Sequence, residues 1–294
     1  MLHPLQGQKI KLSFELEPGT SYKIVLNNSI SFDQEIMGIN YTTDTKISNE
    51  LVTEIAGKSK DGGYHLKCNY SRMEFSLASP RLDLEMSSES SDTSNPMNIM
   101  MKSLIGKNFT RIVSAKDETT DITGLDELIM DELNNINLPL EQKGEFKEYF
   151  LQSFGENAIE EAFRQNSSFY PDNTISPGDE WYVNMITDSY GIPMHLILNI
   201  KFREKSRDHA IFIAEGILAA KSDKSDKDTN TSYSLEGTQV SEVRINLKTG
   251  LIDNNITTQF IKGTISIADP DSTGSIQIPM AIKSRSTREI INKF

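Results

Sequence analysis

Cysteine and histidine are scarce in this sequence, and their scarcity excludes several kinds of site. Cys68 is the only cysteine among 294 residues, so neither an intramolecular disulfide nor a cysteine-based zinc site can form. We expect Cys68 to be a small buried hydrophobic residue. The four histidines are dispersed, and no two lie one helical turn apart, as in the zinc-binding helices of hydrolases. The sequence therefore predicts no metal site.

Motifs of common enzyme classes are also absent. The chain has no Gly-x-Ser-x-Gly, no phosphate-binding Gly-x-x-x-x-Gly-Lys and no dinucleotide-binding Gly-x-Gly-x-x-Gly. Carboxylates are plentiful, and Asp179 and Glu180 beside Trp181 form the most suggestive acidic pair. A turn at the start of a strand accounts for these two residues equally well. We therefore predict a protein that is not an enzyme, with no catalytic residues and no cofactor.

Long hydrophobic runs are missing as well. No stretch approaches the roughly 18 apolar residues that a membrane-spanning helix needs. The composition, 37% hydrophobic and 24% charged, is that of a globular protein with an ample core. The first five residues lack the features of a signal peptide. We expect either a cytoplasmic protein or one whose leader has been removed.

Negative charge is concentrated in one segment. The net charge is −12, and residues 117–164 hold thirteen Asp and Glu against three Lys and Arg. Such a surface repels phosphate backbones, so we predict no nucleic-acid partner. Two interpretations remain: an acidic docking face for a basic protein partner, or the solvated side of a helical segment.

Alternating apolar and polar residues predict mainly antiparallel β-structure. Ile10, Leu12, Phe14 and Leu16 alternate with polar residues, which predicts a half-buried strand. The same alternation begins again near Tyr22, Leu196, Val243, Ile252 and Ile276. Lys248-Thr249-Gly250 predicts a hairpin turn, and Pro279 indicates a sheet edge or a bulge. Asp269–Gly274 resembles the start of a calcium loop, but Met280 replaces the required glutamate, so we expect another hairpin turn.

Helical periodicity is confined to the middle of the chain. Residues 96–105 carry Met97, Met100 and Met101 and precede Gly106, a helix-ending glycine. An acidic first turn opens a helix near Leu125. Apolar residues then continue at spacings of three and four over residues 146–163, with a break expected at Gly155.

Two parts of the sequence look like copies of one unit. Pro18-Gly19 and Pro177-Gly178 each precede a strand pattern, Leu104–Phe109 matches Leu235–Val240, and polar loops at 87–95 and 221–228 precede these glycine motifs. We predict an α+β fold of two duplicated, curved antiparallel halves. The predicted division is 1–116 (β-rich, with a short helix), 117–170 (acidic and helical) and 171–294 (β-rich), and these parts can pack as one continuous domain.

Several short motifs, spread over most of the chain, resemble those of one known family. They are Pro18–Lys23, Gly106–Phe109, Thr123–Leu128, Tyr170–Pro171 with Pro177–Trp181, and Gly237 through Gly250. The family consists of exported proteins of Gram-negative cell envelopes, often lipoproteins, known only as a domain of unknown function. The resemblance implies a periplasmic or outer-membrane-associated location and transfers no catalytic residue. The lipid-attachment cysteine is missing near Met1, which leaves membrane association through a removed, lipidated N-terminus open.

These features lead to three hypotheses about function. The first is a non-catalytic envelope protein whose concave sheet binds a protein partner or a lipid-like, apolar small molecule. Met97, Met100 and Met101 would then adapt to the ligand, or else simply fill the core. The second is a hydrolase with a pair of facing carboxylates. The third is a structural scaffold that uses the acidic segment to bind a basic partner.

Overall fold

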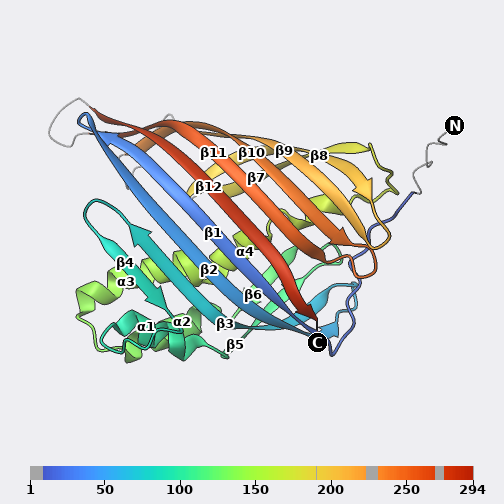
Figure 1. The fold of residues 1–294 in the computed structure, drawn as a ribbon, viewed down its shortest axis with the longest axis horizontal. Coiled ribbons are helices and arrows are strands. Elements are labelled where there is room, and N and C mark those ends of the chain that lie inside the picture. Colours follow the sequence, from blue (N-terminus) through green and yellow to red (C-terminus); the bar gives the residue numbers. More distant parts are fainter. Residues whose placement is uncertain (1–8, 190, 223–230, 269–274, 294) are drawn as a thin grey trace.

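Twelve antiparallel strands form one continuous sheet (Figure 1). The computed structural model describes residues 9–189, 191–222, 231–268 and 275–293. The strands follow the order β6-β5-β3-β2-β1-β12-β11-β10-β9-β8-β7, and β4 pairs with β3. Their bounds are β1 Ser21–Ile36, β2 Ile39–Lys58, β3 Tyr64–Ala78, β4 Asp83–Ser87, β5 Asn108–Val113, β6 Thr119–Thr123, β7 Glu180–Ser189, β8 Ile192–Lys205, β9 His209–Ser222, β10 Thr231–Asn246, β11 Ile252–Ala268 and β12 Ser275–Lys293. Because β1 and β12 are neighbours, the two halves of the chain share this sheet.

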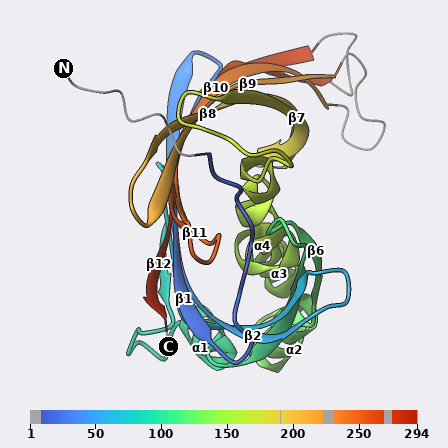
Figure 2. The same cartoon turned by 90° about the vertical axis from the view of Figure 1, so that its right-hand side faces the viewer.

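The sheet curls around the helices (Figure 2), so that its concave face is its inner face. The helices are α1 Pro96–Leu104, α2 Leu125–Asn135, α3 Leu140–Phe154 and α4 Glu156–Phe163, followed by the 3₁₀ helix η1 Asn166–Phe169. None of the helices in the described residues is both long enough and apolar enough to cross a membrane. The prediction of mainly antiparallel β-structure is confirmed. The segment predicted to be helical, 117–170, also contains strand β6.

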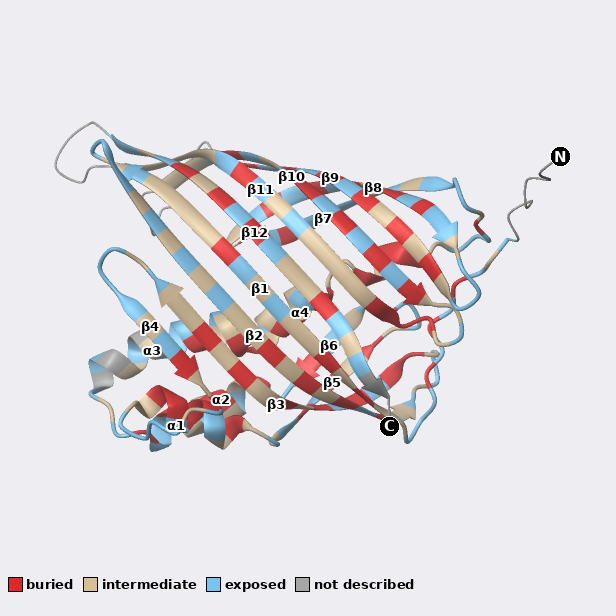
Figure 3. Cartoon of the chain, in the orientation of Figure 1, coloured by how far each residue is buried: buried red, intermediate tan, exposed pale blue. Residues whose placement is uncertain are grey.

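Alternation along each strand separates a buried inner face from a wetter outer face (Figure 3). On β1, Tyr22 and Ile24 are buried, while Lys23 between them lies on the outer face. The register places these two buried side chains opposite Thr53 and Leu51 of β2, which are buried as well. Successive side chains of a strand point to opposite faces, so the sequence periodicity specifies the inward set.

The N-terminal segment departs from the prediction. Leu12, Phe14 and Leu16 are buried as the alternation requires, but the segment makes a single isolated bridge, Ile10 to Ile175, and joins no strand of the sheet. It runs as an extended chain across one end of the curl (Figure 2). Side-chain alternation reports an extended, half-buried backbone, and it does not report whether a neighbouring strand completes the hydrogen bonds.

The helix predictions are confirmed. The break expected at Gly155 separates α3 from α4, and the apolar residues of α2 (Leu125, Ile129 and Leu133) are buried together. The helix at 96–105 is α1, which ends before Gly106, whose φ is +78°. Its methionines Met97, Met100 and Met101 are all buried in the hydrophobic core, so they fill the core as one interpretation held.

The matched motifs of the two halves agree at one place and differ at another. Gly19 donates to Ile55 O on β2 at 2.8 Å, and Gly178 donates to Phe202 O on β8 at 2.7 Å, so both Pro-Gly turns start a strand in the same way. The second pair is not equivalent, since Gly106 follows a helix whereas Gly237 lies inside β10. The duplication therefore stays a prediction.

Two further sequence predictions concern the turn between β10 and β11 and the proline of β12. Residues 248–250 form the β10–β11 turn as predicted, and Gly250 has a φ of +70°. Pairing of β12 with β1 begins at Met280, one residue beyond Pro279, so this proline lies where one neighbour has ended. The calcium-loop motif at 269–274 and most of the polar loop at 221–228 lie outside the described residues.

Candidate functional site

The inner face of β10, β11 and β12 changes from charged to polar to apolar along the strands. We divide this face, together with the side chains of other elements that contact it, into three zones. Nearest the N-terminal segment lies the arginine network, formed by Arg111, Asp117, Asn166 and Arg288. Next comes the polar wall, formed by Gln165, Gln239, Ser241, Thr257, Gln259 and Ser284. Toward the opposite end lies the apolar track, formed by Ile261, Ile265, Ile267, Ile276, Ile278, Met280 and Ile282. The strand register sets this order, since Asn255, Gln259, Ile261 and Ile267 of β11 pair in turn with Arg288, Ser284, Ile282 and Ile276 of β12.

The arginine network is buried and links strand β5, near one edge of the sheet, and the central strand β12 to the helical segment. Arg111 on β5 donates to Asp117 Oδ1 at 3.5 Å, and Asn166 donates to Asp117 Oδ2 at 2.5 Å. Arg288 on β12 donates from Nη1 to Asn166 Oδ1 at 2.7 Å. The ring of Phe163 contacts both guanidinium groups, whose central carbons lie 3.7 Å (Arg111) and 5.0 Å (Arg288) from the centre of the ring.

Asp117 reaches this network from a tight turn. It lies between β5 and β6 and has a φ of +57°, which non-glycine residues seldom adopt. The carboxyl group is buried, and burial raises its pKa, while the two arginines oppose that rise. A strained, buried aspartate indicates that the turn is shaped to bring this carboxyl group to the arginines.

The polar wall fixes the end of the helical segment to the sheet. Gln239 on β10 donates to Gln165 Oε1 at 2.8 Å, and Gln259 on β11 donates to Gln239 Oε1 at 2.9 Å. Ser241 and Thr257 share a hydrogen bond of 2.8 Å in the next row. These buried amides and hydroxyls satisfy one another, as polar groups away from water must.

The apolar track leads from the core to the end of the strands. On β11 the exposed fraction rises from 0% at Ile261 to 38% at Ile267, and Ile265 between them is half-buried. On β12 it rises from 1% at Ile282 to 44% at Ile276. Since these residues all share the inner face, the track is an apolar surface that starts inside the protein and emerges at one end.

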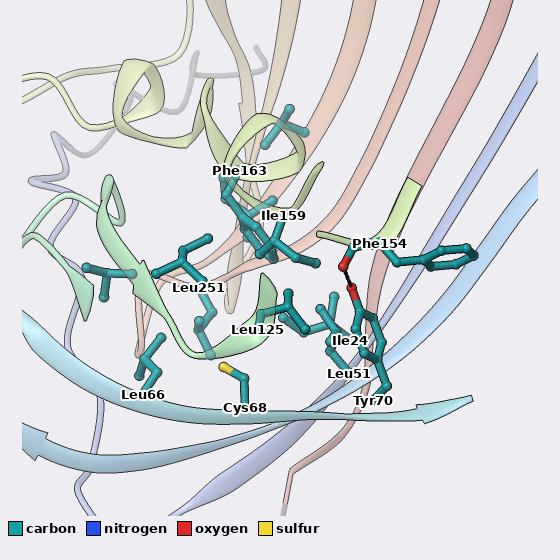
Figure 4. Close-up of a cluster of buried hydrophobic side chains, with 14 of the residues drawn as sticks. Ile24, Leu51, Leu66, Cys68, Tyr70, Leu125, Phe154, Ile159, Phe163 and Leu251 are labelled. Atoms are coloured by element: carbon teal, nitrogen blue, oxygen red, sulfur yellow. Dashed lines mark hydrogen bonds between the residues drawn. The ribbon is translucent and has the colours of Figure 1, made fainter. Parts of the chain in front are cut away.

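The two ends of the curl are covered differently. At the end beside β1 Ser21, the N-terminal segment inserts Leu12, Phe14 and Leu16, and its backbone is held by Glu15 N–H donating to Thr249 O at 2.8 Å. At the end where the track emerges, inner-face Phe32 and Ile47 are half-buried. Figure 4 shows part of the buried hydrophobic core, which includes Ile24, Leu251 and Phe163.

A separate cavity of about 340 Å³ lies between α1 and α2. Its lining includes Ile99 and Met100 of α1, together with Ile136 and the carboxyl group of Glu132. Glu132 also accepts a short hydrogen bond from Lys107, and this bond lowers the pKa of the carboxyl group against the opposing effect of burial. The cavity therefore contains an ionised, already paired acid beside apolar side chains.

Asp126 and Glu156 lie close together and serve as helix caps. Glu156 Oε1 accepts from Leu125 N–H at 3.0 Å at the start of α2, and Asp126 Oδ1 accepts from Glu156 N–H at 2.8 Å at the start of α4. Each carboxyl group thus caps the other's helix. Partial burial raises the pKa of Glu156. The pair Asp179 and Glu180 lies in the predicted strand-start turn, where Glu180 pairs with Lys201 at 2.7 Å.

Cys68 is buried as expected, and burial raises the pKa of its thiol. Within the described ranges, no group of three His, Cys, Asp or Glu side chains is arranged to hold a metal ion. None of the sequence motifs predicted the arginine network. A signal was present, because Arg111 falls between the inward residues Phe109 and Val113, and Arg288 shares the inward parity of Ile282. A charged residue at an inward position of a strand marks a buried polar site.

Comparisons with known proteins bear on the fold and the family. A search of curated proteins finds no match. Among solved structures, lipovitellin is similar with a TM-score of 0.50 and 7% identity, over 95% of this chain and 26% of the lipovitellin chain, so this chain spans about a quarter of that protein. At this identity the likeness shows the fold alone.

Two other structures have far lower scores. DynF from the dynemicin pathway of Micromonospora chersina has a TM-score of 0.19 and 6% identity, over 96% of this chain and 85% of its own. An outer-membrane channel from Pseudomonas putida F1 has a TM-score of 0.22 and 7% identity, over 99% and 100%. Scores this low carry no argument about fold or function. Residues 61–252 match the family of unknown function DUF6263, and since this is more than half of the sequence, the chain belongs to that family.

Proposed function

We propose that this protein is a non-catalytic binding protein for a lipid-like ligand, whose hydrocarbon part lies along the apolar track. The observation that carries the proposal is the gradient of exposure along β11 and β12, from fully buried Ile261 and Ile282 to part-exposed Ile267 and Ile276. A hydrocarbon chain that entered beside Ile267 and Ile276 would meet only apolar side chains on the described parts of these strands until it reached the polar wall.

The dimensions and energetics of the track suit such a ligand. From Ile261 to Ile267 the strand advances about 20 Å, which is long enough for an extended hydrocarbon chain. Each methylene group removed from water contributes about 0.8 kcal/mol, so a few buried methylenes give measurable affinity. Gln259 and Gln239 would end the apolar site, because their amide groups already hydrogen-bond to each other and offer no apolar surface.

The fold and the sequence give independent support. The lipovitellin structure that shares this fold was described for its lipid–protein interactions. The sequence resemblance implies an exported protein, so we propose a periplasmic or outer-membrane-associated location, where lipid-like ligands are at hand. The capping roles of Asp126 and Glu156 support a function without catalysis, since both carboxyl groups already accept backbone hydrogen bonds.

Binding of a fluorescent fatty-acid analogue to matched lysine variants tests the site. Ile267→Lys places a charge on the track, whereas Phe260→Lys places one on the outer face of the same strand, and the two parent side chains are similarly exposed (38% and 40%). We expect Ile267→Lys to weaken binding at least about tenfold, equivalent to about 1.4 kcal/mol. Phe260→Lys should bind like the parent protein. Equal affinities of the two variants for the analogue would contradict the proposal that the ligand binds on the apolar track.

Native mass spectrometry and lipid extraction of the purified full chain test the ligand class. We expect co-purifying lipid-like molecules in the parent protein and fewer in Ile267→Lys. If neither co-purifying ligand nor saturable binding of the analogue is observed, the proposal is wrong. The scaffold hypothesis would then take its place, with salt-sensitive binding to a basic protein as its own test.

A further inference from the structure

The arginine network holds more positive than negative charge. Arg111 and Arg288 are both buried, and Asp117 is the single carboxylate within the network. In the described part of the chain, no carboxylate lies within ion-pair distance of Arg288. With all three groups ionised, the network carries one uncompensated positive charge in the protein interior, and the cost of such a charge is high unless a partner is present.

One guanidinium nitrogen of Arg288 has no hydrogen-bond partner among the described residues. Arg288 donates through Nη1 to Asn166 Oδ1 and, at 3.5 Å, to Ala162 O, whereas its Nη2 is buried and has no hydrogen-bond partner. Arg288 lines a cavity of about 10 Å³, which is roughly the room that one water molecule needs. Tyr22, Ile24, Arg111, Asp117 and Ile290 line the cavity together with Arg288.

We propose that this cavity binds one small inorganic anion such as chloride, held by Arg288 and Arg111. Because chloride is larger than a water molecule, the side chains that line the cavity move apart slightly when the anion binds. The two guanidinium groups come from β5 and β12, both contact the ring of Phe163, and both arginines line the cavity. The aliphatic side chains of Ile24 and Ile290 exclude larger or strongly hydrated anions such as sulfate. The site is distinct from the apolar track, because the polar wall lies between the two on the inner face.

Charge distinguishes an anion from a water molecule here. A water could accept a hydrogen bond from Nη2, but it would leave the excess charge in place. Arginine does not lose its proton in proteins, so the network cannot discharge itself in that way. Burial also raises the pKa of Asp117, which disfavours its negative charge and increases the need for an anion. The ring face of Phe163 offsets only part of the positive charge.

Crystals of the full chain grown in bromide provide a direct test that needs no variant. We expect an anomalous scattering peak in the cavity, within hydrogen-bond reach of Arg288 Nη2. A well-ordered water at this position, with no anomalous signal in bromide, would overturn the proposal.

Thermal unfolding in solution provides the second test. At constant ionic strength, replacing sodium gluconate with sodium chloride should raise the Tm of the parent protein saturably, by about 3 °C. Arg288→Met should abolish this response, while Arg285→Met, which removes an exposed arginine from the outer face of the same strand, should retain it. Equal Tm values in the two salts would contradict the site. If Arg288→Met does not fold, the bromide crystal decides the question.

Discussion

Single hydroxyl and indole groups join the sheet to the helical segment. Tyr70 on β3 donates to Phe154 O at the end of α3 at 2.6 Å (Figure 4), and Trp181 Nε1 donates to Ser168 O at 2.9 Å. Both bonds cross from the sheet to the helices that it surrounds. The Tyr70 hydroxyl is fully buried, and burial raises its pKa, so it remains a hydrogen-bond donor at all ordinary pH values.

We therefore expect Tyr70→Phe to lower the free energy of unfolding by about 1–2 kcal/mol, because Phe154 O would remain buried without this donor. Tyr182→Phe is the matched control, since Tyr182 is 72% exposed, and its effect should stay within about 0.5 kcal/mol. Urea unfolding measures both variants, and the midpoint should shift without a change in slope. An unchanged midpoint for Tyr70→Phe would show that water replaces the tyrosine hydroxyl.

One ion pair on the outer face is expected to contribute to the dependence of stability on pH. Lys23 donates to Glu50 at 2.8 Å, and this hydrogen bond lowers the pKa of Glu50. A carboxyl group whose pKa is lower in the folded state stabilises the protein above its unfolded-state pKa, and this stabilisation is lost as the pH falls through the folded-state pKa. The pair is partly exposed, so its contribution is under about 1 kcal/mol.

We expect Glu50→Gln to be less stable than the parent protein at neutral pH, with the difference narrowing as the pH approaches about 3. Urea midpoints across this range measure the difference. Glu54→Gln, at an exposed position on the same strand, controls for the loss of one surface charge and should show no such narrowing. If the stability difference between Glu50→Gln and the parent protein persists at about pH 3, the loss of stability comes from altered packing and not from the ion pair.

At the scale of elements, Gly155 explains why α3 and α4 are two helices. A Cβ atom on Gly155 would lie 2.6 Å from Leu151 O and 2.8 Å from Asp126 Oδ1, the oxygen that caps α4. The close approach of this position to the last turn of α3 and to Asp126 of α2 therefore requires glycine, although alanine is the better helix former. Gly144, inside α3, has no atom within 4 Å of such a Cβ.

The two glycines thus predict opposite responses to the same substitution. Gly155→Ala should destabilise the protein by about 1–3 kcal/mol through overpacking, whereas Gly144→Ala should stabilise it by about 0.5–1 kcal/mol through helix propensity. Thermal and urea unfolding of both variants measures the contrast. If both substitutions stabilised the protein, the backbone at Gly155 would accommodate the added Cβ atom without a measurable cost in the free energy of unfolding.

For the whole molecule, the pairing of β1 with β12 joins the beginning of the sheet region to its end. The ladder runs from Tyr22–Lys293 to Gln34–Met280, so neither half can close its edge without the other. Unfolding should therefore be a single cooperative transition. The only tryptophan, Trp181 on β7, reports one end of the sheet, while circular dichroism reports all strands.

We expect the fluorescence and circular dichroism midpoints in urea to coincide, with one calorimetric peak. Separate transitions would instead support independent domains corresponding to residues 1–116 and 171–294. This measurement decides between the predicted division and a single folding unit, because two-state behaviour requires that different probes agree.

Local patterns predicted much of this fold, and their failures have physical reasons. The spacing of Leu125, Ile129 and Leu133 predicted α2, because a helical face is a property of consecutive residues. The alternation at Leu12, Phe14 and Leu16 predicted burial correctly but strand pairing incorrectly, since pairing depends on a distant partner. The inward positions of Arg111 and Arg288 were visible in the sequence, but their connection was not. Asp117 and Asn166 join the two arginines only after the sheet has curled.

The sequence by itself determined which side chains of each strand point inward and which parts of the middle segment are helical. These are short-range consequences of backbone geometry, with a period of two for strands and 3.6 for helices. Only the tertiary structure decided that β1 lies beside β12, that the N-terminal segment covers one end of the curl, and that the apolar track emerges at the other. Strand order and coverage depend on contacts between residues far apart in the chain, and many arrangements of those contacts are compatible with one local pattern.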